Sequence, residues 1–276
     1  MSILSNFSGR LSWRTRLREA DAPSALGPIA VFGEHVRLAG DAIKWLFRPP
    51  FRGRLFLEQM EFIGVGSLPI IILVGLFTGM VAAIQAVLVL QIFQQERWAG
   101  LAVGIALASD LAPVFTALMI TARAGSGIAT ELGSMRVSEQ IDALVTLSVN
   151  PVQYLITPRL VASVVMVPVM CMVFNFVGLV GGYLVAVVLY HVDFGQLSAL
   201  FRFWVDPLDY MKGLIKATVF GFTIAVAACY QGFNVRGGAK EVGRATTSAV
   251  VIGSVSVLVL DYFLIQILSA IWPFVS

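Results

Sequence analysis

A run of 32 residues without a charge, from Phe62 to Phe93, constrains the fold of this chain more than any other feature of its sequence. At 1.5 Å per residue, one uninterrupted helix of that length extends about 48 Å, whereas the hydrocarbon core of a bilayer is about 30 Å thick. We therefore expect this segment to cross a membrane and either to tilt strongly or to break. Gly64, Gly66, Pro69, Gly75 and Gly79 are expected breaking points, and the pair Gly75 and Gly79 also favours close approach of another helix.

The composition excludes a water-soluble globular protein. Hydrophobic residues make up 58% of the 276 and charged residues only 13%, which leaves too few charges to cover the surface of a soluble domain of this size. The net charge of +3 and the pI near 9.0 are compatible with nucleic-acid binding. The basic residues, however, lie in a few polar islands without interleaved aromatic residues, so we expect no nucleic-acid partner.

The apolar runs predict an all-α integral membrane protein with five transmembrane helices. Short polar segments separate the runs, and each run is long enough for a helix to cross the bilayer. In the third run, Pro168 and the cluster Gly178, Gly181 and Gly182 mark points of bending or close packing. The five spans are expected at about residues 62–93, 101–122, 160–190, 217–235 and 245–272.

Two further segments are expected to lie outside the hydrocarbon. Residues 1–27 form a polar, arginine-bearing tail without an apolar run of signal-peptide type, so we expect the tail to stay in the cytosol, and we assign it no role. Residues 28–50 repeat apolar side chains every three or four positions and end at two prolines, which predicts an amphipathic helix in the cytoplasmic interface. A helix packed on a soluble partner is the alternative. The aromatic residues between His191 and Lys216 predict another interfacial segment.

The distribution of Lys and Arg predicts the orientation. With the N-terminus in the cytosol, the inside segments hold 15 of the 19 basic residues, and the outside turns hold only Arg97, Arg202, Lys212 and Lys216. The predicted topology is therefore N-inside and C-outside. It places residues 123–159 in the cytosol.

Two aspartates lie within predicted spans. An ionised carboxylate is costly against lipid, so Asp110, three residues before Pro113, should face a cavity or a partner, and we favour a functional role over a purely structural hydrogen bond. Asp261 is the only charge in the fifth span and also needs a partner. Lys216, expected at the same depth of the preceding span, is a candidate for that partner.

No enzyme motif is present. The two histidines, His35 and His191, are far apart in the sequence, and the two cysteines, Cys171 and Cys229, lie inside apolar runs, so we predict neither catalytic residues nor a metal site. The sequence contains no GxxxxGK[ST] motif, and we therefore expect no ATP site and no cofactor in this chain. Any ATP-driven process would need a separate ATPase.

The polar segment from Arg123 to Pro151 separates the second and third spans. Within it, Ser138 is expected to cap a helix that runs to Val149, with Glu139 and Asp142 in the first turn. This helix would carry a small apolar face, and an exposed apolar face with a charged back is suited to a groove on a partner protein. An ordinary solvated loop is the alternative. The residues of the expected face are Ile141, Leu144 and Val145.

The sequence RAGSGIATELGSMRVSEQIDAL, residues 123–144, resembles the signature of the MlaE-type (YrbE-like) permease family. These proteins are the membrane subunits of bacterial lipid-asymmetry ABC transporters that work with MCE-domain proteins. Three other stretches are similar to the family, at 85–93, at 110–114, and in the last span as GRATTSAVV and LDYF. The resemblance covers roughly residues 30 to 272, so a permease domain is expected over 28–276.

The resemblance implies a homodimer of permeases on a dimer of cytosolic ABC ATPases that bind the ATP. It also implies a phospholipid substrate, a periplasmic MCE-domain partner and a place in the bacterial inner membrane. A lipid cavity at the dimer axis would be lined by Leu90, Phe93 and Asp110. The segment 123–159 would dock on the ATPase, with Gly125, Gly127 and Gly133 permitting tight turns and with polar contacts from Glu131, Arg136, Glu139, Gln140 and Asp142.

One departure from the family concerns the second span. Its common Arg-Glu-Leu-Gly-Pro pattern is replaced by Ser109, Asp110, Leu111, Ala112 and Pro113, so the basic residue is missing and the acid is shorter. Our hypothesis is an ATP-driven phospholipid permease. The alternatives are a proton-coupled secondary transporter that uses Asp110 and Asp261, and a membrane scaffold without transport.

Overall fold

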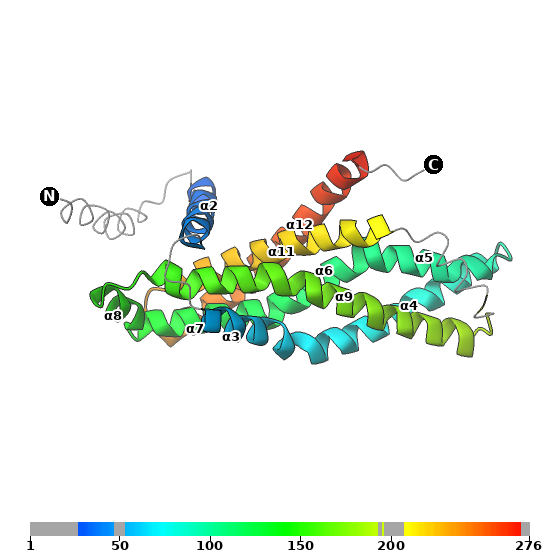
Figure 1. Ribbon diagram of the computed structural model, residues 1–276, viewed down its shortest axis with the longest axis horizontal. Coiled ribbons are helices and arrows are strands. Elements are labelled where there is room, and N and C mark those ends of the chain that lie inside the picture. The colour runs from blue at the N-terminus through cyan, green and yellow to red at the C-terminus, as the bar shows by residue number, and fades with distance from the viewer. Residues whose placement is uncertain (1–26, 47–52, 193–194, 196–206, 272–276) are drawn as a thin grey trace. The chain divides into compact units, whose positions relative to one another are not determined.

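The computed structural model describes residues 27–46, 53–192, 195 and 207–271 (Figure 1). Every regular element in these ranges is helical, which confirms the all-α class. The predicted tail, apart from Gly27, lies outside the described residues. So do the aromatic residues of the expected segment between Phe194 and Trp204.

Contacts divide the chain into two units, Met1–Leu38 and Ala39–Ser276. The described part of the first unit is the N-terminal portion of helix α2, which runs from Gly27 to Leu46. On this portion Phe32 and Val36 are exposed, as expected for the apolar stripe of an amphipathic helix. Its location in the membrane interface stays a prediction.

Five helical stretches in the described residues are long and apolar enough to cross a membrane, which confirms the predicted number of spans. Each span extends beyond its predicted limits at one or both ends, because polar residues continue the helix past the apolar run. The stretches are Gly53–Gln91, Ala99–Val137, Val152–Val188, Leu208–Phe233 and Ala239–Ile271. The orientation of the spans across the bilayer stays a prediction.

The first span breaks at Gly64 and Gly66, two of the five predicted breaking points, and not at Pro69, Gly75 or Gly79, which lie within an unbroken helix. Helix α3, Gly53–Ile63, is followed by a 3-10 turn, Val65–Ser67, and by α4, Leu68–Gln91. The Ser67 hydroxyl donates to the Ile63 carbonyl at 2.7 Å and so satisfies one backbone acceptor at the break. The charge-free run therefore crosses as α4, which has 24 residues, rather than as one overlong helix.

The third span is the central packing element of the second unit. Helix α9, Thr157–Val188, lies beside α4 and beside α11, Pro207–Phe233 (Figure 1). At the α4–α9 crossing, a Cβ placed on Gly79 would run into the backbone of Gly178. This confirms the predicted close approach, because the backbones can come so near only when the residue at position 79 has no Cβ.

The second span is longer and less regular than the sequence predicted. It consists of α5, Ala99–Ala106, α6, Ala112–Ile120, and α7, Ser126–Val137, joined by two π-helical segments, Leu107–Leu111 and Thr121–Gly125. No tight turn forms at the three glycines of the polar segment, and the expectation that they shape a turn was wrong. Ile128, Ala129 and Leu132 are buried as α7 packs on α11 and α12, so tertiary packing keeps this polar stretch helical.

The remaining elements complete the second unit. Helix α8 covers Gln140–Thr146, a third π-helical segment covers Val152–Ile156, and α12 covers Ala239–Ile271. Helix α12 packs on α6, α7 and α11 and exposes large apolar side chains along much of its length, among them Val251, Val255 and Tyr262. Such a surface suits lipid or another membrane helix.

Candidate functional site

Three ionisable side chains from different spans meet inside the second unit. Lys216 Nζ lies 2.5 Å from Asp110 Oδ1 and 3.1 Å from Asp261 Oδ1. This confirms the predicted Lys216–Asp261 pair, and it adds Asp110 as a second partner. We call Asp110, Lys216 and Asp261 the charge cluster.

Local structure and core packing bring the charge cluster together. Asp110 stands on the π-helical segment Leu107–Leu111, where the helix is locally widened, a feature frequent at functional sites. Lys216 comes from α11 and Asp261 from α12. A core of Ala117, Phe220, Ile224 and Val257 locks α6, α11 and α12 against one another within about one or two turns of the three charges.

In the charge cluster the Asp110 carboxylate is accessible and the Lys216 ammonium group is buried. The Lys216 side chain is 3% exposed and that of Asp261 17%, whereas that of Asp110 is 51% exposed. Lys216 donates hydrogen bonds to the Ser109 carbonyl at 3.0 Å and to the Asp110 carboxylate, and it forms an ion pair with Asp261, so three oxygens of the protein surround the ammonium group. The accessible charge is therefore that of Asp110. Lys216 also supplies, from another helix, a cation beside the acid of the second span.

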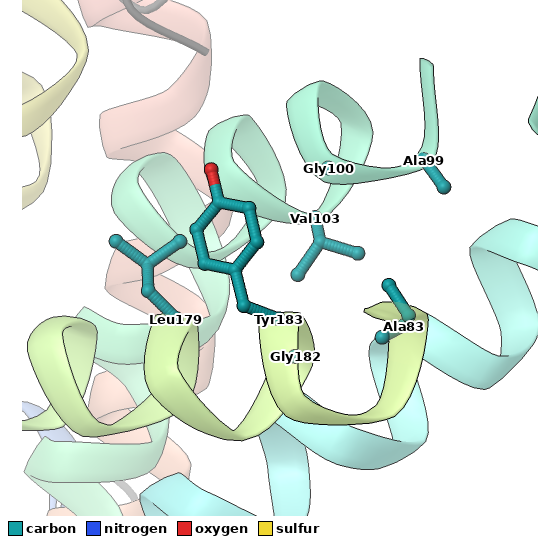
Figure 2. Close-up of a pocket in the computed structure, with 8 residues that line it drawn as sticks. Ala83, Ala99, Gly100, Val103, Leu179, Gly182 and Tyr183 are labelled. Atoms are coloured by element: carbon teal, nitrogen blue, oxygen red, sulfur yellow. The ribbon is translucent and has the colours of Figure 1, made fainter. Parts of the chain in front are cut away.

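The other two predicted lipid contacts lie at the C-terminal end of α4. Phe93 is 68% exposed just beyond the helix, and Leu90 is partly buried. A small cavity lies between α4, α5 and α9, with room for about one water molecule, and it is too small for a lipid (Figure 2). Leu90, Phe93 and Asp110 do not line it. Its lining residues are Ala83, Ala99, Gly100, Val103, Leu179, Gly182, Tyr183 and Ala186.

The connection between the second and third spans contains the predicted helix in a shorter form. Helix α8 begins at Gln140 rather than at Ser138, and it ends at Thr146 rather than at Val149. Ser138 does not cap it, because its hydroxyl donates to the Ser134 carbonyl at 2.8 Å at the end of α7. The expectation that Glu139 lies in the first turn was wrong: it precedes the helix in the left-handed conformation, with φ 59°, and makes the turn between α7 and α8.

Ion pairs within the chain engage three of the five polar residues predicted to contact an ATPase. Arg136 Nη1 lies 3.1 Å from Asp142 Oδ1 and fastens α8 to the end of α7. Glu131 Oε2 lies 2.8 Å from Arg159 Nη2, across to the start of α9. The other two, Glu139 and Gln140, are exposed at the α7–α8 turn.

The predicted apolar face of α8 points toward the protein. Ile141 is 1% exposed, and Leu144 and Val145 are partly buried, so the expectation of an exposed face at these residues was wrong. The short helix folds back on α7 and buries its amphipathic stripe there. The exposed apolar side chains are instead Leu147, at 73%, and Val137. Leu147 is an apolar residue that lies outside the apolar stripe of α8. Its position outside the stripe is the sequence signal from which its exposure could have been predicted.

Two arginines with defined partners were not predicted as site residues. Arg123 donates to the Phe62 carbonyl, and its guanidinium lies 5.0 Å from the centre of the Phe62 ring, so it braces the break between α3 and α4. Arg159 is 2% exposed and holds Glu131. A basic residue next to one end of a long apolar run was the available signal for both.

These features define a polytopic helical membrane protein with an internal charge cluster and a short helical connection outside its spans. A family model described as Permease MlaE matches residues 56–267, which is most of the chain. The chain therefore belongs to the MlaE permease family.

Curated relatives agree with this assignment. The chain is 40% identical over 229 residues to a probable ABC transporter permease protein of Rickettsia prowazekii, a match that covers 82% of this chain and 87% of the relative. It is 37% identical over 215 residues to the intermembrane phospholipid transport system permease protein MlaE of Haemophilus influenzae, covering 78% and 82%. The chloroplastic protein TRIGALACTOSYLDIACYLGLYCEROL 1 of Arabidopsis thaliana is 34% identical over 227 residues, covering 82% and 65%.

Proposed function

We propose that this chain is the permease subunit of an ABC transporter that moves phospholipid between the bacterial inner membrane and a periplasmic MCE-domain protein. ATP is bound and hydrolysed by a separate cytosolic ATPase. The observation that carries the proposal is the family match over residues 56–267, together with relatives named as ABC transporter and intermembrane phospholipid permeases. The same match does not favour a proton-coupled carrier that uses Asp110 and Asp261.

The proposed lipid site needs two copies of the chain. In the homodimer, Leu90, Phe93 and Asp110 of each copy line a cavity at the shared axis. The exposure of Phe93 and of the Asp110 carboxylate supports this assignment, because both are available to a ligand or to a second copy. With the Lys216 ammonium buried, the site holds acyl chains by apolar contact, and its accessible charge suits an ammonium headgroup better than a bare phosphate.

The proposed site of ATPase docking is the α7–α8 connection. Glu139, Gln140 and the exposed Leu147 contact the ATPase, while the Arg136–Asp142 ion pair holds α8 against the end of α7. An exposed apolar side chain within a polar rim is typical of a small protein–protein contact.

In the proposed mechanism, ATP binding closes the two ATPases, displaces the docked connections and narrows the cavity at the dimer axis. A lipid moves only if the two conformations bind it with different affinities, because a ligand bound equally by both shifts no equilibrium. Narrowing an apolar cavity lowers its affinity for acyl chains and so meets this requirement.

The first test is purification of the tagged chain from its native membrane. Mass spectrometry should find an ABC ATPase and bound phospholipid, and reconstituted vesicles should transfer lipid only when ATP is added. Transfer driven by a proton gradient without ATP, or purification without any ATPase, would contradict the proposal.

A single substitution tests the docking site. Leu147→Glu places a charge where we propose an apolar contact, so it should reduce the amount of co-purified ATPase at least tenfold. The matched control is Gln94→Glu, which adds the same charge at the exposed turn after α4 and should leave co-purification unchanged. Equal recovery from both variants would exclude Leu147 from the contact.

A further inference from the structure

The buried arginine at the start of the third span joins two parts of the chain that the proposed docking moves. Arg159 Nη2 lies 2.8 Å from Glu131 Oε2, and Arg159 Nη1 donates to the Leu155 carbonyl at 2.8 Å. The Arg159 side chain is 3% exposed, while that of Glu131 is 50% exposed. Arg159 is therefore the buried member of the pair, and Glu131 is the member at the surface, on the helix that leads to the α7–α8 connection.

The pair makes a direct link between the second and third spans. Glu131 is on α7, half a helix before the α7–α8 turn, and Arg159 is in the first turn of α9. Helices α7 and α9 both pack along α11, so the ion pair adds a side-chain connection across that arrangement. A displacement of α7 that keeps the pair intact must also move the start of α9.

The hydrogen bonds around Arg159 connect it to the segment that leads from α8 into α9. The acceptor of its Nη1, Leu155, belongs to the π-helical segment Val152–Ile156, and such segments are frequent where helices adjust for function. The same segment follows α8 after a short turn that Asn150 closes by accepting from the Val152 backbone at 2.9 Å. Arg159, at the start of α9, thus contacts both α7 and the π-helical segment, the two elements that precede and follow α8.

The Arg159 cation is almost completely buried, and Glu131 is the carboxylate that the structure places beside it. In some proteins a buried charge of this kind contributes to conformational specificity rather than to stability. Resting on the proposed function, we infer that Arg159 is a positioning residue for energy coupling: it holds Glu131 so that movement of the docked α7–α8 connection is passed to the third span.

The test measures lipid transferred per ATP hydrolysed by the purified permease–ATPase complex in vesicles. Arg159→Gln should keep ATPase assembly and basal hydrolysis within twofold of the wild type but lower lipid transferred per ATP at least tenfold. Arg159→Lys keeps the positive charge beside Glu131, and it should restore at least half of the coupling. The matched control is Arg244→Gln, which removes the arginine of an exposed Arg–Glu pair on α12 and should change nothing.

A double variant separates this role from a direct contact of Glu131 with the ATPase. If the pair acts as one unit, Glu131→Gln combined with Arg159→Gln is no worse than Arg159→Gln alone, whereas independent roles multiply the two losses. Multiplied losses, wild-type coupling in Arg159→Gln, or equal loss of assembly and coupling in both Arg159 variants would overturn the inference. If wild-type vesicles transfer no lipid with ATP, the proposed function itself fails.

Discussion

Lys216 is the residue on which the charge balance within the spans depends. It is the cation between two carboxylates, and it is almost completely buried. Asp110 could lose its charge and still leave Lys216 paired with Asp261. Removal of Lys216 leaves two carboxylates facing each other.

We therefore predict that Lys216→Met destabilises the purified protein by about 3–5 kcal/mol, because removing one side of a buried ion pair leaves an uncompensated charge. Asp110→Asn should cost less than Lys216→Met, since one ion pair remains. Thermal unfolding in a single detergent measures both effects. Lys240→Met, at an exposed position of α12, is the control and should stay within about 0.5 kcal/mol of the wild type. Identical unfolding of the two lysine variants would contradict this prediction.

At the scale of the elements, the contact between α4 and α9 depends on Gly79, where the backbone of α4 meets that of Gly178. A Cβ at Gly79 meets the backbone of Gly178, which cannot move aside as a flexible side chain can. The helices must separate to accommodate it, and the separation loses packing along the whole crossing.

We predict that Gly79→Ala destabilises the protein by about 1–3 kcal/mol, the usual cost of overpacking. Gly243 on α12 provides the matched comparison, because a Cβ there meets nothing within 4 Å. Gly243→Ala should be neutral or stabilising by up to about 1 kcal/mol, through helix propensity alone. The same unfolding assay measures both variants, and a harmless Gly79→Ala would mean that the crossing is looser than it is in this structure.

Elements were predictable where the apolar pattern was continuous and less so where packing determined the conformation. The break after Ile63 followed from glycines within an overlong run. The extension of the second span through α7 did not, because its polar stretch is helical only through the burial of Ile128, Ala129 and Leu132 on neighbouring helices. The inward face of α8 has the same cause.

At the scale of the whole molecule, the predicted orientation places α8 in the cytosol and the turn after α4 outside. Both native cysteines are fully buried, so an engineered cysteine can be labelled without background.

We predict that Glu96→Cys in spheroplasts reacts with a membrane-impermeant maleimide, and that Thr146→Cys reacts only after the membrane is permeabilised. Both positions are exposed, so accessibility from each side decides the result. The unsubstituted protein is the control and should remain unlabelled. The reverse pattern would place the connection outside and would exclude docking of a cytosolic ATPase there.

The sequence by itself determined the class of protein, the number of spans, the helix break and the family, because these depend on runs and motifs that lie within a single stretch of chain. The pairing of charges from separate helices became visible only once the helices were packed together. The second span lacks the basic residue expected at position 109, and Lys216 of α11 supplies a cation there. Glu131 likewise pairs with Arg159 of the next span. The physical reason is that an ion pair between helices depends on their relative rotation and depth, which follow from packing.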